Sequence, residues 1–235
     1  MKRNSSKIML AINIFAITLL FTLNYFYQIK DFDYTLKCIC SSIFAVLGLI
    51  NFGYTLATKR KNKKFFVGMT IALILSMLGD VVLHFSFVAG TGTFAISHIF
   101  FIVTYCFIQK FQKSDLLIAC LTFVPIALFL IFCPVLHFEE PIFKPVCVIY
   151  ASIISTMFGK ATGNFIREKN LLNGILAGAS LLFLFSDFIL VFSLFSDVLP
   201  WANNACMATY YPALCIFAFS IFLKASIPES SKSIH

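Results

Sequence analysis

The chain has 235 residues, of which 60% are hydrophobic and only 12% are charged. Soluble domains carry about 25% charged residues, so this composition excludes a water-soluble globular protein and indicates an integral membrane protein. The net charge of +8 does not indicate a nucleic-acid partner, because the basic residues lie between apolar runs, where they report membrane topology.

Eight apolar segments each approach the length of about 20 residues that a helix needs to cross a bilayer. The sequence therefore predicts an all-α fold, a single membrane domain over residues 1–235 with eight transmembrane helices and a short polar tail over 224–235. The first segment follows basic residues, but its length and the absence of a small-residue cleavage site predict an uncleaved helix. The expected spans are 8–27, 36–57, 65–88, 93–109, 116–136, 145–164, 171–195 and 202–223.

Short uncharged tracts, AGTGT and SDVLPWA, are expected to form the turns after the third and seventh spans. With the N-terminus in the cytoplasm, 15 Lys and Arg residues lie on the cytoplasmic side and only Lys30, Lys37 and Lys144 lie opposite. This asymmetry predicts that both termini are cytoplasmic. The bacterial cytoplasmic membrane is the favoured location, and the endoplasmic reticulum membrane is the alternative.

Cysteine spacing argues against metal and redox chemistry. All eight cysteines lie in or at the ends of apolar segments, and the chain has no CxxC pair. We therefore expect no metal site and no cofactor.

The most informative stretch is residues 75–86, LSMLGDVVLHFS, in which a carboxylate lies within an apolar run. The pattern returns 107 residues later as LFLFSDFILVFS, residues 182–193, so Asp80 and Asp187 occupy equivalent positions. A charge in hydrocarbon costs several kcal/mol, which makes both aspartates functional candidates. The structural alternative is that each carboxylate caps a helix break or accepts a hydrogen bond from a neighbouring hydroxyl.

The same offset relates two halves of the chain, about 8–109 and about 115–223, with four spans each. Lys37 then falls on Lys144, at the outer ends of the second and sixth spans. Because both halves run in the same direction, we predict a parallel 4+4 internal repeat around a pseudo-two-fold axis along the membrane normal.

Asp80 and Asp187 are the candidate catalytic residues. Two carboxylates held close together in a low dielectric should not both be ionised, so one would act as an acid while the other stays a base. General acid–base hydrolysis needs this division. The same features also suit a proton-coupled transporter of a small solute or lipid, and a scaffold without activity is a third interpretation.

Other polar side chains are candidates for substrate binding or for supporting the aspartates. His84 lies one helical turn after Asp80, where a hydrogen bond or an interfacial position is favoured over catalysis. For His98, a functional role and a packing role are both open. Lys37 and Lys144 either reach lipid headgroups or bind an anionic group such as a phosphodiester. The remaining candidates are Ser186, Asn204 and Tyr210.

Several tracts resemble the YhhN family of membrane proteins: LGDVVL with Asp80, FAISHIFF with His98, GASLLFLFSDF with Asp187, and Lys37 at the head of the second span. The resemblance covers nearly the whole chain, in order. The family often has Tyr three residues after the motif His, where this chain has Phe101, so a phenol at that position has no role here.

The characterised members of this family are lysoplasmalogenases. The resemblance implies hydrolysis of the vinyl ether of an alkenyl lysophospholipid, giving a fatty aldehyde and glycerophosphoethanolamine or glycerophosphocholine. A neutral carboxylic acid would protonate the β-carbon, and a nearby carboxylate would stabilise the resulting cation and activate water. In this hypothesis His98 orients one aspartate and Lys37 receives the phosphate. Membrane lipids are the expected surroundings, and the oligomeric state is open.

Overall fold

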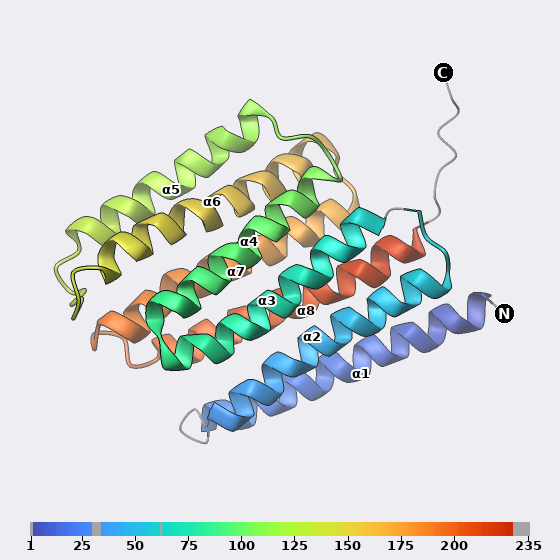
Figure 1. The fold of residues 1–235 in the computed structure, drawn as a ribbon, viewed down its shortest axis with the longest axis horizontal. Helices are drawn as coiled ribbons and strands as arrows, with labels where there is room; N and C mark the ends of the chain where they lie inside the picture. Colours follow the sequence, from blue (N-terminus) through green and yellow to red (C-terminus); the bar gives the residue numbers. More distant parts are fainter. Residues whose placement is uncertain (1, 30–33, 62, 228–235) are drawn as a thin grey trace.

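The computed structural model describes residues 2–29, 34–61 and 63–227, so Lys30 and Lys232, which entered the charge count, lie outside the described residues. The described part is all-helical, with eight helices long and apolar enough to cross a membrane, as predicted. The helices run side by side (Figure 1). They are α1 (Lys2–Ile29), α2 (Tyr34–Ala57), α3 (Lys63–Phe85), α4 (Phe87–Cys106), α5 (Lys113–Phe132), α6 (Phe143–Arg167), α7 (Leu171–Phe195) and α8 (Ala202–Ser226).

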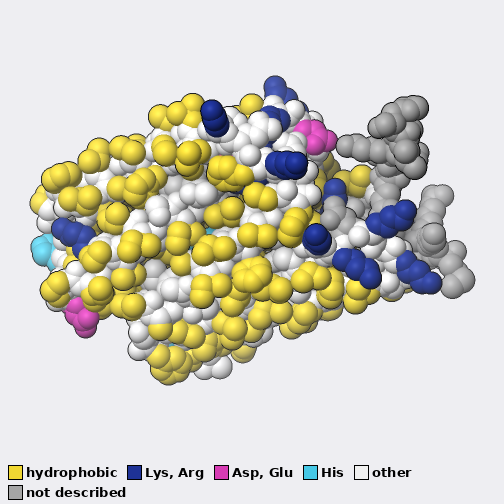
Figure 2. All heavy atoms as spheres, turned by 45° about the horizontal axis from the view of Figure 1, so that its top comes forward, with side chains coloured by type: hydrophobic (Ala, Val, Ile, Leu, Met, Phe, Trp, Pro, Cys, Tyr) yellow, Lys and Arg dark blue, Asp and Glu magenta, His cyan; other side chains and the backbone are white. Residues whose placement is uncertain are grey.

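One end of the bundle is distinctly basic. Helix α1 begins and α8 ends at this end, as an even number of spans requires (Figure 1). Hydrophobic side chains cover the middle of the face shown in Figure 2, and most of its Lys and Arg side chains lie toward this end. We call this end the basic end.

The connection between α3 and α4 differs from the prediction, because the AGTGT tract is helical. The break falls at Ser86, whose side chain accepts a hydrogen bond from the Ala89 backbone N–H and so caps α4. Gly90 lies inside α4, where a Cβ atom would come within 2.4 Å of the Leu83 Cα atom. The glycine therefore permits close approach of α3 and α4. A glycine-rich tract predicts a turn equally well, so the sequence pattern misplaces the break.

Helix α5 also ends earlier than predicted, at Phe132 and not at residue 136. Cys133 has an extended backbone and Pro134 follows it. A residue before proline is disfavoured in the helical conformation, which accounts for the earlier end.

Helix α8 lies at the centre of the packing. It packs against α1, α2, α3 and α7, and α4 packs against both α3 and α6. The largest buried cluster includes Phe44, Phe183, Tyr211 and Phe217. Helix α5 lies at one edge of the bundle beside α6, and α1 lies at the other edge (Figure 1).

A buried ion cluster ties α5 to α6 near the basic end. The side chains of Asp115 and Lys160 are fully buried, and Lys160 Nζ lies 3.1 Å from Asp115 Oδ2. Lys160 also donates a 2.6 Å hydrogen bond to the side-chain oxygen of Asn164. Arg167 Nη1 donates to the other carboxylate oxygen of Asp115 at 2.5 Å. From the sequence, Lys160 and Arg167 were expected only to report topology, whereas in the structure they also hold α5 against α6.

We expect Asp115→Asn to destabilise the protein by about 3 kcal/mol, because removing one partner of a buried ion pair leaves uncompensated charge. Thermal unfolding in detergent should show a clearly lower midpoint. Glu168→Gln is the matched control, since this exposed carboxylate only accepts a hydrogen bond from Gln109. Equal midpoints for the two variants would contradict the role assigned to the cluster.

Candidate active site

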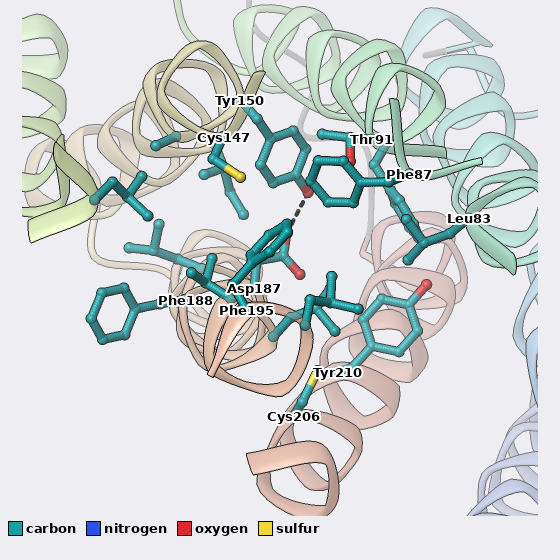
Figure 3. A pocket seen from close by; sticks show the side chains of 18 of the residues that line it. Leu83, Phe87, Thr91, Cys147, Tyr150, Asp187, Phe188, Phe195, Cys206 and Tyr210 are labelled. Atoms are coloured by element: carbon teal, nitrogen blue, oxygen red, sulfur yellow. Dashed lines mark hydrogen bonds between the residues drawn. The ribbon is translucent and has the colours of Figure 1, made fainter. Parts of the chain in front are cut away.

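A cavity lies within the helix bundle, in the half away from the basic end. Its empty space, which includes space open to the surroundings, is about 880 Å³. Most of the lining is aliphatic and aromatic, and Figure 3 shows part of it. The polar part of the lining consists of Lys37, Asp80, Thr91, Tyr150, Asp187 and Tyr210, with two cysteines.

Asp80 on α3 is fixed by groups from two neighbouring helices. Its side chain is only 4% exposed, and Lys37 Nζ from α2 lies 3.8 Å from Oδ1. Ser41 Oγ donates to Oδ2 at 2.5 Å, and Tyr210 Oη from α8 donates to the same oxygen at 2.8 Å. A cation and two hydroxyl donors offset much of the cost of burying a negative charge. The carboxylate is thereby held where α2, α3 and α8 meet.

Asp187 on α7 has a different set of partners. The Tyr150 hydroxyl from α6 donates to its Oδ2, as the dashed line in Figure 3 marks. Ser186 Oγ lies 3.2 Å from its Oδ1. The fully buried His98 places Nε2 at 2.7 Å from the Tyr150 oxygen and at 3.6 Å from Asp187 Oδ2.

The direction of these hydrogen bonds follows from the charge on Asp187. With Asp187 ionised, Tyr150 donates its single hydroxyl hydrogen to the carboxylate, so His98 Nε2 supplies the hydrogen that it shares with the Tyr150 oxygen. The other ring nitrogen, Nδ1, is buried and has no hydrogen-bond partner within the described part of the chain. The result is a directed chain from His98 through Tyr150 to Asp187.

The cavity brings together residues that are far apart in the sequence. Asp80, Asp187, Lys37 and Tyr210, all candidates from the sequence, line it. His98 reaches it through the Tyr150 hydroxyl. The two aspartates line one cavity, but among the described residues no hydrogen bond joins their carboxylates, so a substrate or a water molecule would act between them.

Four further candidates lie outside the lining. Ser186 contacts Asp187 but donates its shorter hydrogen bond, 2.8 Å, to a carbonyl of its own helix. Lys144 donates to a backbone carbonyl of α5 at 3.2 Å. His84 is exposed near the end of α3, where its ring stacks on that of Tyr34 with 4.0 Å between the ring centroids. Asn204 is exposed near the start of α8.

Tyr150, the hydrogen-bond partner of Asp187, is not among the site residues predicted from the sequence. The depth of Tyr150 in the membrane could have identified it as a partner of Asp187. Tyr150 lies seven residues into α6 and Asp187 lies eight residues before the end of α7, so both stand about 10–12 Å from the same end of the bundle. Phe101, at the position where the family often has a phenol, packs its ring 4.4 Å from that of Phe217. Tyr150 therefore supplies His98 with a phenol from another helix.

The cavity shows no arrangement typical of a metal centre. Among the described residues, no group of three His, Cys, Asp or Glu side chains is placed to hold a metal ion. What the cavity presents is a pair of separately anchored carboxylates in apolar surroundings, a lysine beside one of them and a tyrosine beside each. This set can transfer protons and stabilise a cation.

Fold and cavity together define a multi-pass α-helical membrane protein with a carboxylate-lined cavity inside its helix bundle. The family model described as YhhN family matches residues 32–221. The chain belongs to the YhhN family, which confirms the resemblance seen in its motifs.

Three proteins similar to this chain are named for an enzymatic activity. The chain is 28% identical to "Lysoplasmalogenase TMEM86B" of Mus musculus over 151 residues, which are 63% of this chain and 61% of the mouse protein. The protein of the same name from Homo sapiens is 27% identical over 161 residues, 68% of this chain and 65% of its own length. The Rattus norvegicus protein is 30% identical over 152 residues, 63% and 59% of the two chains.

The match therefore spans about three-fifths of the length of these curated relatives. No solved structure matches the chain.

Proposed function

We propose that this protein hydrolyses the vinyl ether bond of lysoplasmalogens, releasing a fatty aldehyde and glycerophosphoethanolamine or glycerophosphocholine. The relatives named lysoplasmalogenase support the substrate class. One structural observation carries the proposal: Asp80 and Asp187 line the same apolar cavity while separate donors hold each carboxylate.

The proposed reaction starts with proton transfer to carbon. One carboxylic acid protonates the β-carbon of the vinyl ether, and the carbon attached to oxygen becomes oxocarbenium-like. The other carboxylate stabilises this cation and takes a proton from the water that attacks it, which gives a hemiacetal. Glycoside hydrolysis follows a similar logic, with two carboxyl groups flanking an oxocarbenium-like transition state.

The second half of the reaction restores both groups. The carboxyl group that took a proton from water gives it to the glycerol oxygen as the carbon–oxygen bond breaks. The first carboxylate recovers a proton from the hemiacetal hydroxyl, which becomes the aldehyde carbonyl. One water is consumed and both aspartates return to their starting states, so the reaction needs no cofactor. Lys37, beside Asp80 at the edge of the cavity, is the group that we propose contacts the phosphate.

Tyr150 acts in this scheme as a positioning residue for Asp187. We expect Tyr150→Phe to lower kcat by about 10- to 100-fold with little change in KM, because the ring volume remains while the donated hydrogen bond is lost. Michaelis kinetics of aldehyde release measure the split. Tyr105→Phe is the matched control, since this buried phenol pairs with Ser180 at 3.0 Å away from the cavity. A wild-type kcat for folded Tyr150→Phe would remove the residue from the mechanism.

The proposed function is tested with purified protein in detergent micelles and matched alkenyl, alkyl and acyl lysophospholipids. Free aldehyde should form from the alkenyl lipid alone, because only a vinyl ether can be protonated at carbon. The same assay separates hydrolysis from transport, since transport needs two compartments and an enzyme turns over in micelles. No aldehyde from any alkenyl lysophospholipid would overturn the proposal.

We further propose that the basic end faces the cytoplasm, which places both termini there and the cavity in the outer half of the membrane. The distribution of Lys and Arg supports this orientation (Figure 2). A bacterial cytoplasmic membrane is favoured, with the endoplasmic reticulum membrane as the alternative. A reporter fused after α8 that is active only in the cytoplasm tests the orientation.

The parallel 4+4 repeat also belongs to the proposal. Helix α4 packs against α6, and α8 packs against α2, which are equivalent pairs if the second half repeats the first. Helix α3 packs on α4 as α7 packs on α8. This pairing supports a pseudo-two-fold arrangement that brings Asp80 and Asp187 to one cavity.

A further inference from the structure

One part of the cavity, which we call the arm, is lined by apolar side chains from three helices. Helices α5, α6 and α7 all contribute to it, and none of these arm residues is charged. The side chains that line the arm are Ile126, Leu130, Ala151, Ile154, Leu184 and Phe188.

Between α5 and α7, the arm is closed by side-chain contacts and not by close packing of the two helix backbones. Helix α5 packs its backbone closely against α6, and α7 packs against α6 and α8. Aromatic rings close the seam between α5 and α7: the Phe129 ring lies 5.2 Å from that of Phe188 and 5.5 Å from that of Phe192. All three rings are partly exposed. Figure 3 shows Phe188 on the side of the cavity away from Tyr210.

Outside the seam lies a surface suited to hydrocarbon. On α7, Leu181 and Phe185 are 51% and 49% exposed, and they continue the helical face that carries Phe188. On α5, Leu128 and Phe132 are 52% and 73% exposed. The seam therefore separates the cavity from the lipid-facing surface by a single layer of aromatic side chains.

Helix α5 is also the wall best suited to move. It contains Pro125, one turn before Phe129. Proline removes one backbone hydrogen bond of a helix and favours bending there. Helix α5 packs mainly on α6, so a bend at Pro125 would leave the contacts of α3 and α8 and the partners of Asp80 in place.

The arm is too short to enclose a lipid chain. Ile154, at its inner end, lies one turn beyond Tyr150, which is about 6 Å along the helix. A lipid chain spans half of the hydrocarbon core, or about 15 Å. Most of a chain whose first carbons lie beside Asp187 must therefore leave the arm.

We propose that the α5–α7 seam binds the hydrocarbon chain of a single-chain amphiphile. The carbons next to the reacting bond lie in the arm, and the rest of the chain passes between Phe129 and Phe188 into the lipid. This inference rests on the proposed function and adds the route: the lysolipid enters, and the fatty aldehyde leaves, sideways through the seam. The protein then contacts the headgroup and the first few carbons of the chain, and it does not discriminate between lipids by the far end of the chain.

The first test uses an alkenyl lysophospholipid with a pyrene at the far end of its chain, beside the unmodified lipid. A chain that leaves through the seam keeps the pyrene in the micelle, so kcat/KM should stay within about threefold of the unmodified value. A loss of about 50-fold or more for the pyrene lipid alone would show an enclosing pocket and overturn the seam.

A second test does not need turnover. A non-hydrolysable alkyl lysophospholipid with a photoreactive diazirine at mid-chain should crosslink to the α5 and α7 segments around Phe129 and Phe188. Crosslinks confined to α2, α3 or α8 would overturn the seam even if the protein proved inactive. Failure of the proposed function and failure of the seam are therefore distinguishable.

A variant pair adds a kinetic readout. Phe188→Trp narrows the seam and should raise KM for a long-chain substrate about tenfold, with a much smaller effect on a short-chain analogue that fits within the arm. Phe26→Trp, at an exposed position of α1 on the other edge of the bundle, is the matched control and should leave both KM values unchanged. Equal effects of Phe188→Trp on both chain lengths would contradict the chain path.

Discussion

Asp80→Asn should reduce kcat/KM for aldehyde release by about 10³-fold or more. The amide keeps the shape of the side chain and can still accept hydrogen bonds from Ser41 and Tyr210, so the packing should survive. It can neither hold a negative charge opposite the oxocarbenium-like centre nor pass a proton, and each of these functions alone is worth about 10²–10³-fold or more. The measurement is the initial rate of aldehyde formation from an alkenyl lysophospholipid in micelles.

The control is Asp197→Asn, the same chemical change at an exposed position between α7 and α8. It should turn over like wild type. Both variants must elute as single species and unfold at similar temperatures, which separates lost chemistry from lost folding. Full turnover by a folded Asp80→Asn protein would show that the mechanism is wrong.

Asp187→Asn should cause a loss of similar size, and the double variant should be little worse than either single variant. In the proposed reaction both carboxyl groups act in each half, one as acid and the other as base, so removing one makes the second ineffective. Residues that act as a unit show such strong non-additivity. The measurement is a double-mutant cycle on kcat/KM with the same substrate.

Independent action would give a different result. If the loss in the double variant equalled the product of the single losses, the two carboxylates would contribute separately. A shared reaction at one cavity would then be contradicted, whereas two unrelated structural roles would fit.

Much of the architecture could be predicted from the sequence, because the signals are strong and local. Long apolar runs define eight helices, and each run has the length that a bilayer requires. A lone carboxylate inside such a run is costly, so Asp80 and Asp187 stand out without any knowledge of their neighbours. Glycine at position 90 misled the prediction because it signals a turn and a close helix contact equally well.

The hydrogen bonds of the aspartates could not be predicted, because most of the donors come from other helices. Ser41 and Tyr210 donate to Asp80, but the offset of 107 residues places Val148 and Val103 at the equivalent positions, and neither can donate from its side chain. The proposed repeat therefore predicts the equivalence of the carboxylates and not their hydrogen bonds.

The two lysines show the same divergence. The Lys37 side chain lies beside Asp80, whereas Lys144 donates a hydrogen bond to a backbone carbonyl of α5. In the proposed repeat, equivalent positions share the same depth in the membrane. The direction of a side chain depends on the neighbouring helices, which only the folded chain reveals.

The central claim is that an aspartic acid in the cavity delivers a proton to carbon, and turnover in heavy water tests it most directly. Wild-type protein is incubated with an alkenyl lysophospholipid in D₂O, the aldehyde is reduced to an alcohol as it forms, and the product is analysed by mass spectrometry. The account predicts a single deuterium on the carbon next to the former carbonyl. An aldehyde without deuterium at that carbon would contradict it.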